Sequence, residues 1–318
     1  MSQYPQNVAI EGNGGVSGLS LMPSAMARLL IPFKVVRIDL LDEQGWPVLI
    51  RDDHGNEARA TVASGFLLRD QSVVYVYTCC HVVTGIDLDS PRLPGSIAQA
   101  RRFKLRISMQ TAEPLPKPNI GHLIGGLSSV DVDLYDNSTN PPTPLWEQDE
   151  QCVSNDALSL ANLSEPFWHD LVRIRLPETL QLAAVQALSP SDLWTNLVSP
   201  GDSLLIVGYP YGYSAHAANP TPIVLKRSVA AVPSGRHRIA LIDGAGAPGM
   251  SGGPVFYESN DRLYLYGIYI GVIYPDAAVG VSQGEKTTAL GRVCSLTHLS
   301  SLGLSQCPTP VSPPIAPP

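Results

Sequence analysis

The stretch Gly249-Met250-Ser251-Gly252-Gly253-Pro254 places a serine among glycines. An apolar run precedes it at 239–242 and another follows at 255–257, so we expect a loop between two strands. Glycines permit backbone angles that a Cβ forbids, which leaves the serine and the neighbouring N–H groups exposed. This pattern is typical of a nucleophile beside an oxyanion hole. A glycine-rich hairpin with an incidental serine is the alternative for this stretch alone.

Composition predicts a globular protein with a lightly charged surface. The chain has 318 residues, of which 44% are hydrophobic and 15% charged, enough for two packed units. Its net charge of −7 argues against binding nucleic acid, and we expect the basic cluster at 101–106 to be one face of a strand. No apolar run approaches about 18 residues, and the N-terminus lacks a leader pattern. We therefore expect neither a membrane span nor a secretory signal.

The cysteines are expected to be mostly reduced, which favours a cytoplasmic protein. Their number is odd, and no pair has the CxxC spacing of a metal site. A metal held by Cys79, Cys80 and His81 is disfavoured because adjacent residues rarely surround one ion. We expect no cofactor and no metal. The five are Cys79, Cys80, Cys152, Cys294 and Cys307.

Short β-rich runs separated by turns predict an all-β protein, and two sets of strands fit a pair of small β-barrels. We expect an N-terminal arm at 1–30, a first barrel at 31–188, a second barrel at 189–304 and a proline-rich tail at 305–318. Short helices are expected at 190–197, in the crossing segment, and at 295–302. The expected strands lie at 33–40, 60–68, 72–78, 103–109, 130–135, 167–176, 203–207, 223–232, 239–242, 263–273 and 286–293.

A nucleophilic serine needs a base, and the base needs an orienting acceptor. His81 follows the strand at 72–78, and Asp170 lies at the polar-to-apolar switch within 168–176, so each can project from a strand end. His81 alone would suit a buried core histidine. Other residues compete with Asp170, although acids in an alternating strand usually face solvent. These rivals are His169, Asp131, Asp133 and Asp136.

Together these motifs resemble the trypsin-like (chymotrypsin-fold) serine peptidases of bacterial type. The resemblance spans roughly residues 33–300 and implies two six-stranded antiparallel β-barrels packed face to face, with a short crossing helix and a C-terminal helix. It is carried by Ser64-Gly65-Phe66-Leu67, Tyr77-Thr78-Cys79-Cys80-His81-Val82-Val83, Asp170-Leu171-Val172-Arg173-Ile174, Gly208-Tyr209-Pro210 and the serine loop.

The resemblance implies a serine endopeptidase acting on protein or peptide substrates. Ser251 would attack the scissile carbonyl, His81 would move the proton, and Asp170 would orient the imidazole. The amides of Gly249 and Ser251 would bind the oxyanion. By the family pattern, the substrate pocket has its floor at Ala245 and its wall along Ile270-Gly271-Val272. Without an acid at Ala245, and with Val272 narrowing the pocket, we expect cleavage after small or medium apolar residues.

Three features depart from the family pattern. Two cysteines stand directly before His81, either as small packing residues or as redox-sensitive thiols. Met250 stands where animal trypsins carry an aspartate, and it cannot pair with a freed N-terminal amine, so we expect no activation of that kind. The long interval from His81 to Asp170 contains proline clusters and is expected to hold surface insertions.

Two other functions remain open. The serine loop also satisfies GxSxG, and Asp276 and His298 follow Ser251 in the order of an α/β-hydrolase esterase. That fold needs helices alternating with parallel strands, and few helical patterns occur. A binding or scaffold module with a blunted site is the second alternative. The oligomeric state is not indicated by the sequence.

Overall fold

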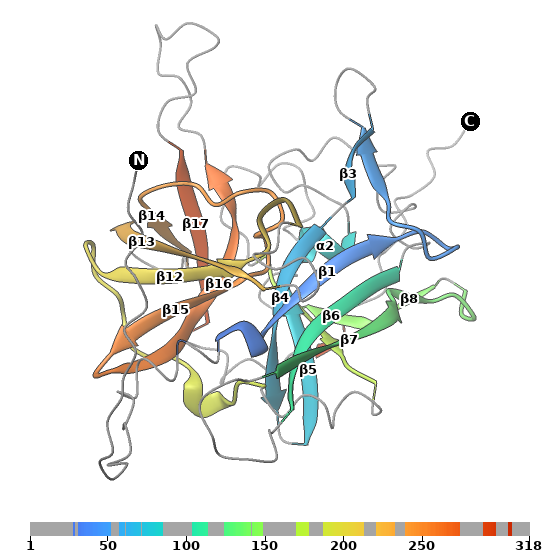
Figure 1. Ribbon diagram of the computed structural model, residues 1–318, viewed down its shortest axis with the longest axis horizontal. Coiled ribbons are helices and arrows are strands. Elements are labelled where there is room, and N and C mark those ends of the chain that lie inside the picture. The colour runs from blue at the N-terminus through green and yellow to red at the C-terminus, as the bar shows by residue number, and fades with distance from the viewer. Residues whose placement is uncertain are drawn as a thin grey trace, which may run out of the picture.

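The computed structural model of the protein consists mainly of strands (Figure 1). It describes residues 28, 31–51, 57–60, 62–70, 72–84, 104–113, 124–140, 142–148, 170–177, 187–212, 221–232, 239–273, 289–296 and 305–306. Within these ranges, no helix has the length and apolar character needed to cross a membrane. Most of the expected arm and tail lie outside the described residues.

The N-terminal part of the chain, up to β11 and joined by residues 305–306 from near the C-terminus, forms an eight-stranded antiparallel sheet in the order β18-β10-β11-β5-β4-β1-β6-β7. Burial along the start of β5 shows why its sequence forms a strand, since Val74 and Val76 are fully buried whereas Val73 and Tyr75 are partly exposed. The strands are β1 (Val35–Leu41), β4 (Val62–Asp70), β5 (Val73–Thr78), β6 (Lys104–Glu113), β7 (Ile124–Asp133), β10 (Trp146–Gln148), β11 (Val172–Arg175) and β18 (Ser305–Gln306).

The second half forms a closed barrel in the order β12-β13-β14-β17-β16-β15. Its interior is filled by side chains such as Leu204, Ile206 and Val255, all fully buried. The strands are β12 (Ser203–Gly208), β13 (Ile223–Ala231), β14 (Ile239–Ile242), β15 (Pro254–Ser259), β16 (Arg262–Ile273) and β17 (Leu290–Ser295). Smaller elements are β2 (Leu49–Arg51), β3 (Glu57–Ala60), β8 (Tyr135–Asp136), β9 (Thr143–Pro144), η1 (Ile31–Phe33), α2 (Cys80–Thr84), η5 (Pro190–Asp192) and η6 (Pro210–Gly212).

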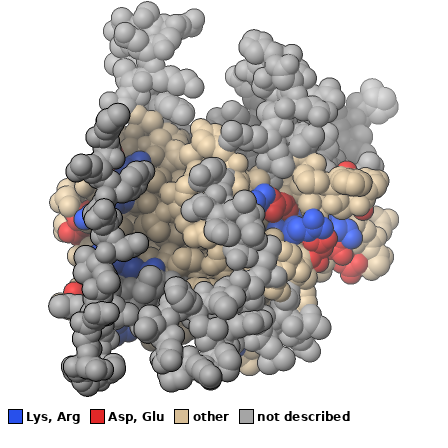
Figure 2. Space-filling view, in the orientation of Figure 1, with Lys and Arg blue, Asp and Glu red and all other residues tan. Residues whose placement is uncertain are grey.

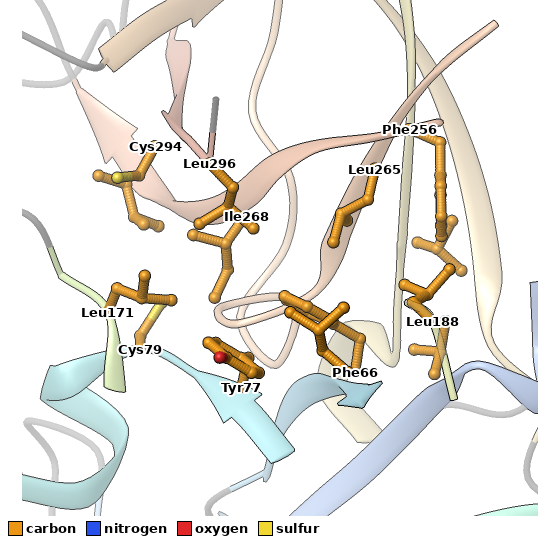
Figure 3. Packing of buried hydrophobic residues seen from close by; sticks show 14 of the residues in the cluster. Phe66, Tyr77, Cys79, Leu171, Leu188, Phe256, Leu265, Ile268, Cys294 and Leu296 are labelled. Carbon is orange, nitrogen blue, oxygen red and sulfur yellow. The ribbon is translucent and has the colours of Figure 1, made fainter. Parts of the chain in front are cut away.

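A single apolar cluster joins the sheet to the barrel. Phe66 and Tyr77 of the first sheet stack with ring centroids 5.4 Å apart, and both are almost completely buried. Figure 3 shows them facing barrel side chains that include Leu265 and Ile268. Because burial of such side chains is the main favourable term in folding, this cluster fixes how the two halves sit against each other.

The crossing segment is held by both halves. The backbone of Leu188 forms hydrogen bonds with the backbones of Leu67 and Arg69 on β4. The backbone N–H of Trp194 donates to the carbonyl of Leu265 on β16 at 2.8 Å. The helix expected at 190–197 is only the three-residue 3-10 turn η5. The domain boundary placed there remains a prediction.

The all-β class and the six-stranded second barrel are confirmed. The first half differs in detail, because it is an eight-stranded sheet that includes the short strands β10 and β18. Residues 305 and 306, expected to belong to the tail, pair with β10. The closing helix was expected at 295–302, but β17 extends to residue 295, and residues 297–302 lie outside the described residues.

Opposite charges pair across β6 and β7. Lys104 lies 3.3 Å from Asp133, and Arg106 lies 2.8 Å from Asp131. On the face shown in Figure 2, acidic and basic side chains are interspersed over this side of the sheet. The described part of the 101–106 cluster is thus one face of a strand, as expected.

Candidate active site

His81 occupies the first turn of α2, directly after β5 ends at Thr78. The apolar β5 side chains anchor the strand in the core, so the chain leaves the sheet at a fixed point. The His81 side chain is 27% exposed, which leaves part of the ring accessible. A half-buried histidine that follows an anchored strand is well placed to act as a general base.

Asp170 reaches His81 through strand register. Val172 on β11 pairs with Thr78 on β5, so Asp170, two residues earlier on the antiparallel strand, lies level with the start of α2. Its carboxylate is 2% exposed. Oδ2 lies 2.5 Å from His81 Nδ1, and Oδ1 accepts the His81 backbone N–H at 2.9 Å.

The electrostatics favour an ionised Asp170. Burial by itself would raise the pKa of Asp170, but the attraction of His81 and the hydrogen bonds that Asp170 accepts hold the pKa below its ordinary value. A carboxylate only accepts hydrogen bonds, so His81 Nδ1 carries the proton and Nε2 is the unprotonated ring nitrogen. The pair is therefore arranged so that Nε2 can act as a base.

The serine loop lies between β14 and β15 and is tightly turned. Gly249 has φ +94° and Gly252 φ +85°, which explains why glycine stands at both positions. The Met250 N–H donates to Ala247 and the Gly253 N–H to Met250. The Met250 side chain is fully buried in the barrel core. The loop thereby fixes Ser251 between an anchored methionine and strand β15.

The same loop is bonded to the first sheet through Ser64. The Ser64 N–H donates to the Ser251 carbonyl at 2.9 Å, and the Ser64 hydroxyl donates to the Gly249 carbonyl at 2.7 Å. That hydroxyl also accepts the Tyr209 N–H at 2.9 Å. Sequence reasoning gave Ser64 no role; a serine within the apolar strand β4 was the available signal.

At Gly252 the serine loop packs tightly against the first sheet. A Cβ there would lie 2.1 Å from the Ser64 carbonyl oxygen and 2.3 Å from Thr78 Oγ1. The Gly252 N–H donates to the Tyr269 carbonyl at 2.8 Å, and the Cys79 thiol donates to the same oxygen at 3.4 Å. Ser251 is thus brought next to the strand end that carries His81.

The serine loop has unused hydrogen-bonding groups. Among the described residues, no acceptor is found for the N–H of Gly249 or Ser251, and no partner for the Ser251 hydroxyl. Two N–H groups beside a serine are the arrangement of an oxyanion hole. Among the described residues, the hydrogen bond between His81 and Asp170 is formed, whereas none joins His81 to Ser251.

The rival acids have other partners. Asp131 and Asp133 form ion pairs with Arg and Lys side chains on β6, and Asp136 accepts hydrogen bonds from Ser138. Strand β7 is also separated from β5 by three strands of the sheet. The remaining rivals, His169, Asp276 and His298, lie outside the described residues. Ser251 itself lies between antiparallel barrel strands, unlike the strand-to-helix elbow that the esterase alternative needs.

The expected pocket residues lie on two neighbouring segments. Ala245 is half-buried before the serine loop, and Val272 packs against the barrel core. Ile270 points into the cluster between sheet and barrel. Tyr269, not singled out from the sequence, accepts the Gly246 N–H on its hydroxyl at 2.7 Å, and its ring lies directly against Gly246. The Tyr269 ring therefore lies beside the segment that carries Ala245.

Cys79, His81 and Asp170 place one potential metal-binding atom each within 4.8 Å of one another. A metal requires the thiolate form, but burial foremost, with Asp170 next, raises the pKa of Cys79 well above its ordinary value. The same shift disfavours the redox role considered for this thiol. Cys80 packs in the core of the first sheet. The chemistry of the trio therefore fits a hydrogen-bonded group better than a metal site.

Comparison with known proteins identifies a family. A family model described as a trypsin-like peptidase domain matches residues 63–268. The crystal structure of Deg5 is 16% identical, with 88% of this chain and 91% of that chain covered and a TM-score of 0.45. A serine endoprotease from Yersinia pestis is 16% identical, with coverage of 87% and 64% and a TM-score of 0.43. The thermostable serine protease AL20, from an extremophilic microorganism, is 12% identical, with coverage of 84% and 92% and a TM-score of 0.43. No curated protein matches the chain.

We predict that Gly252→Ala separates the serine loop from the first sheet, because the new Cβ would collide with Ser64 and Thr78. The free energy of unfolding should fall by about 3 kcal/mol or more in urea titrations. Gly201→Ala is the matched control, since Gly201 has a similar φ of +93° with open space around it. It should cost only about 1 kcal/mol. Equal losses in the two variants would contradict the steric account.

Asp170 is predicted to make stability depend on acid pH. Folding lowers the pKa of Asp170, so its carboxylate stabilises the fold above the unfolded value of about 4. This contribution is lost as the pH falls through the lower folded value. Between about pH 5 and about pH 2, urea midpoints of the wild type should fall further than those of Asp170→Asn. The exposed control Asp261→Asn should follow the wild type; parallel curves for all three would refute the assignment.

Proposed function

Because this chain belongs to the trypsin-like peptidase family, and is accordingly a serine endopeptidase, we propose that Ser251, His81 and Asp170 are its catalytic triad. The observation that carries the proposal is the buried Asp170 carboxylate, which bonds both the ring and the backbone of His81. A core histidine with a structural role would not require a buried anion aimed at one ring nitrogen while leaving the ring part-exposed.

In the proposed mechanism, His81 Nε2 removes the proton from the Ser251 hydroxyl as its oxygen attacks the scissile carbonyl carbon. The carbonyl oxygen becomes an oxyanion, which the N–H groups of Gly249 and Ser251 bind. Each such donor is worth roughly 3 kcal/mol to the transition state. Asp170 stabilises the imidazolium and keeps Nδ1 protonated.

The tetrahedral intermediate then collapses. His81 gives its proton to the leaving amine, the carbon–nitrogen bond breaks, and the acyl group stays on Ser251 as an ester. Water repeats the attack with His81 again as the base, which releases the carboxylic acid product and restores the serine.

For the substrate, we propose a small or medium apolar residue on the acyl side of the cut. Ala245 offers no negative charge for Arg or Lys, and Tyr269 lies against Gly246 beside it. Val272 narrows the opposite wall. The burial of Met250 in the barrel core supports a site that does not wait for a freed N-terminal amine.

Full-length protein with its N-terminus untrimmed should hydrolyse unfolded protein substrates, and Ser251→Ala should lower kcat by about 10⁴-fold or more. The matched control Ser259→Ala, at the far end of β15, should retain wild-type activity. A fluorophosphonate probe should label the wild type and the control but not Ser251→Ala. Labelling or hydrolysis that survives the loss of Ser251 would disprove the proposed nucleophile.

Cleavage specificity is tested with peptides that differ only in the residue before the cut. Ala or Val peptides should exceed Arg or Lys peptides in kcat/KM by about tenfold or more. Val272→Gly should shift the preference towards Leu and Phe, because it removes side-chain volume from the expected wall. Best cleavage after Arg or Lys, or no shift in the variant, would reject the pocket assignment.

A further inference from the structure

Ser64 is a polar residue buried in strand β4, and each of its hydrogen-bonding groups has a partner. Its side chain has no exposed surface, and its carbonyl accepts the Thr78 hydroxyl at 2.9 Å. Its N–H donates to the Ser251 carbonyl, and its hydroxyl donates to the Gly249 carbonyl and accepts the Tyr209 N–H. An alanine would serve the packing of β4 without forming either hydroxyl bond, so the serine has a further use.

The two carbonyls that Ser64 holds belong to the two proposed oxyanion donors. Its bonds to the carbonyls of Gly249 and Ser251 fix the peptide group that follows each donor. The peptide group that precedes Gly249 is held by Tyr211, whose N–H donates to the Pro248 carbonyl at 2.5 Å. Because the C=O and N–H of a trans peptide point in opposite directions, this bond turns the Gly249 N–H away from Tyr211. Gly249 is therefore restrained on both sides, and Ser64 supplies one of the two restraints.

The Ser64 hydroxyl also supports η6, the turn that carries Tyr211. It accepts the N–H of Tyr209, the residue directly before η6. Tyr211 has φ +54°, which is uncommon for a residue with a Cβ, so this turn needs support. Space for the hydroxyl depends on Gly208, where a Cβ would lie 2.7 Å from Ser64 Oγ. One hydroxyl thus contacts both the serine loop and the turn that packs against it.

We infer that Ser64 is a positioning residue, whose hydroxyl holds the Gly249 backbone so that its N–H faces the oxyanion. This inference rests on the proposed function. Buried polar groups that lose a hydrogen bond are costly, so without this hydroxyl the Gly249 backbone would rotate towards other donors. Both oxyanion donors belong to the barrel, and Ser64 ties them to the sheet that carries His81 and Asp170.

The first experiment compares Ser64→Ala with Ser108→Ala. Ser108 is the matched control because it is also buried in the first sheet, and its hydroxyl bonds only to Ser129 on β7, at 2.9 Å. Ser64→Ala should lower kcat about 30-fold and change KM by less than about twofold, because the oxyanion forms only in the transition state. Ser108→Ala should keep the wild-type kcat even if both variants lower Tm equally.

A peptidyl trifluoromethyl ketone ending in valine separates positioning from simple destabilisation. The Ser251 oxygen adds to the ketone carbon, its proton passes to His81, and the ketone oxygen becomes the oxyanion. The inhibition constant of this ketone should rise about 30-fold in Ser64→Ala, in parallel with the fall in kcat. The corresponding peptidyl alcohol cannot form the oxyanion, so its inhibition constant should change by less than about twofold.

Gly208→Ala offers an independent way to displace the same hydroxyl. Its Cβ would collide with Ser64 Oγ, so kcat should fall by about tenfold or more. In Ser64→Ala the hydroxyl is already absent, and adding Gly208→Ala should cost less than about threefold. The amide resonances of Gly249 and Ser251 should shift in Ser64→Ala and Gly208→Ala but not in Ser108→Ala, and this signal does not depend on activity.

Wild-type kcat and ketone affinity in Ser64→Ala would overturn the inference. Equal losses in Ser108→Ala, or full additivity of Ser64→Ala and Gly208→Ala, would also overturn it. The proposed function fails separately, if the wild type shows no hydrolysis that depends on Ser251. The amide resonances of Gly249 and Ser251 still decide in that case whether Ser64 holds the serine loop.

Discussion

The carbonyl oxygen of Tyr269 is the point on which the geometry of the site depends. It accepts a hydrogen bond from Gly252 in the serine loop and another from Cys79 at the end of β5. Both donors come from segments far apart in the chain, and each lies within two residues of a proposed catalytic residue. The contact is possible only because position 252 lacks a Cβ. The strong sequence pattern around Ser251 thus reflects packing against Ser64 and Thr78 as well as chemistry.

A second constraint is the burial of Asp170. A carboxylate removed from water is costly unless it is well bonded, and here the bonds come from the residue that it is proposed to orient. Both oxygens contact His81, one through the ring and one through the backbone. The backbone contact fixes where α2 begins, and the ring contact fixes the tautomer. The structural and catalytic demands on Asp170 are therefore met by the same two hydrogen bonds.

Local patterns allowed much of this arrangement to be predicted. Side-chain chemistry and period-two alternation were enough to recognise three features in the sequence. These are the glycines around Ser251, the strand before His81 and the polar-to-apolar switch at Asp170. The β10 strand was missed because three residues beside a proline cluster show no alternation. The 190–197 helix was overestimated because its start signals, a proline and an acid, support only one short turn.

The supporting residues of the site could not be predicted in the same way. The acceptor on Tyr269 is a backbone carbonyl, which every residue type possesses, so the sequence carries no mark of it. Ser64 and Cys79 resemble small packing residues until the fold places polar groups opposite them. Met250 differs from these residues because its side chain alone carried the information. An apolar methionine was not expected to form an ion pair, and the structure buries its side chain in the barrel core.

The most direct test of the central claim, that one site forms where sheet and barrel meet, is a crystal structure of the full-length protein after reaction with a peptidyl phosphonate. Phosphorus should be bonded to Ser251 Oγ, His81 Nε2 should lie within about 3 Å of an adduct oxygen, and the phosphonyl oxygen should accept the N–H groups of Gly249 and Ser251. An adduct on another residue, or a His81 ring directed away from Ser251 in every accessible rotamer, would contradict it.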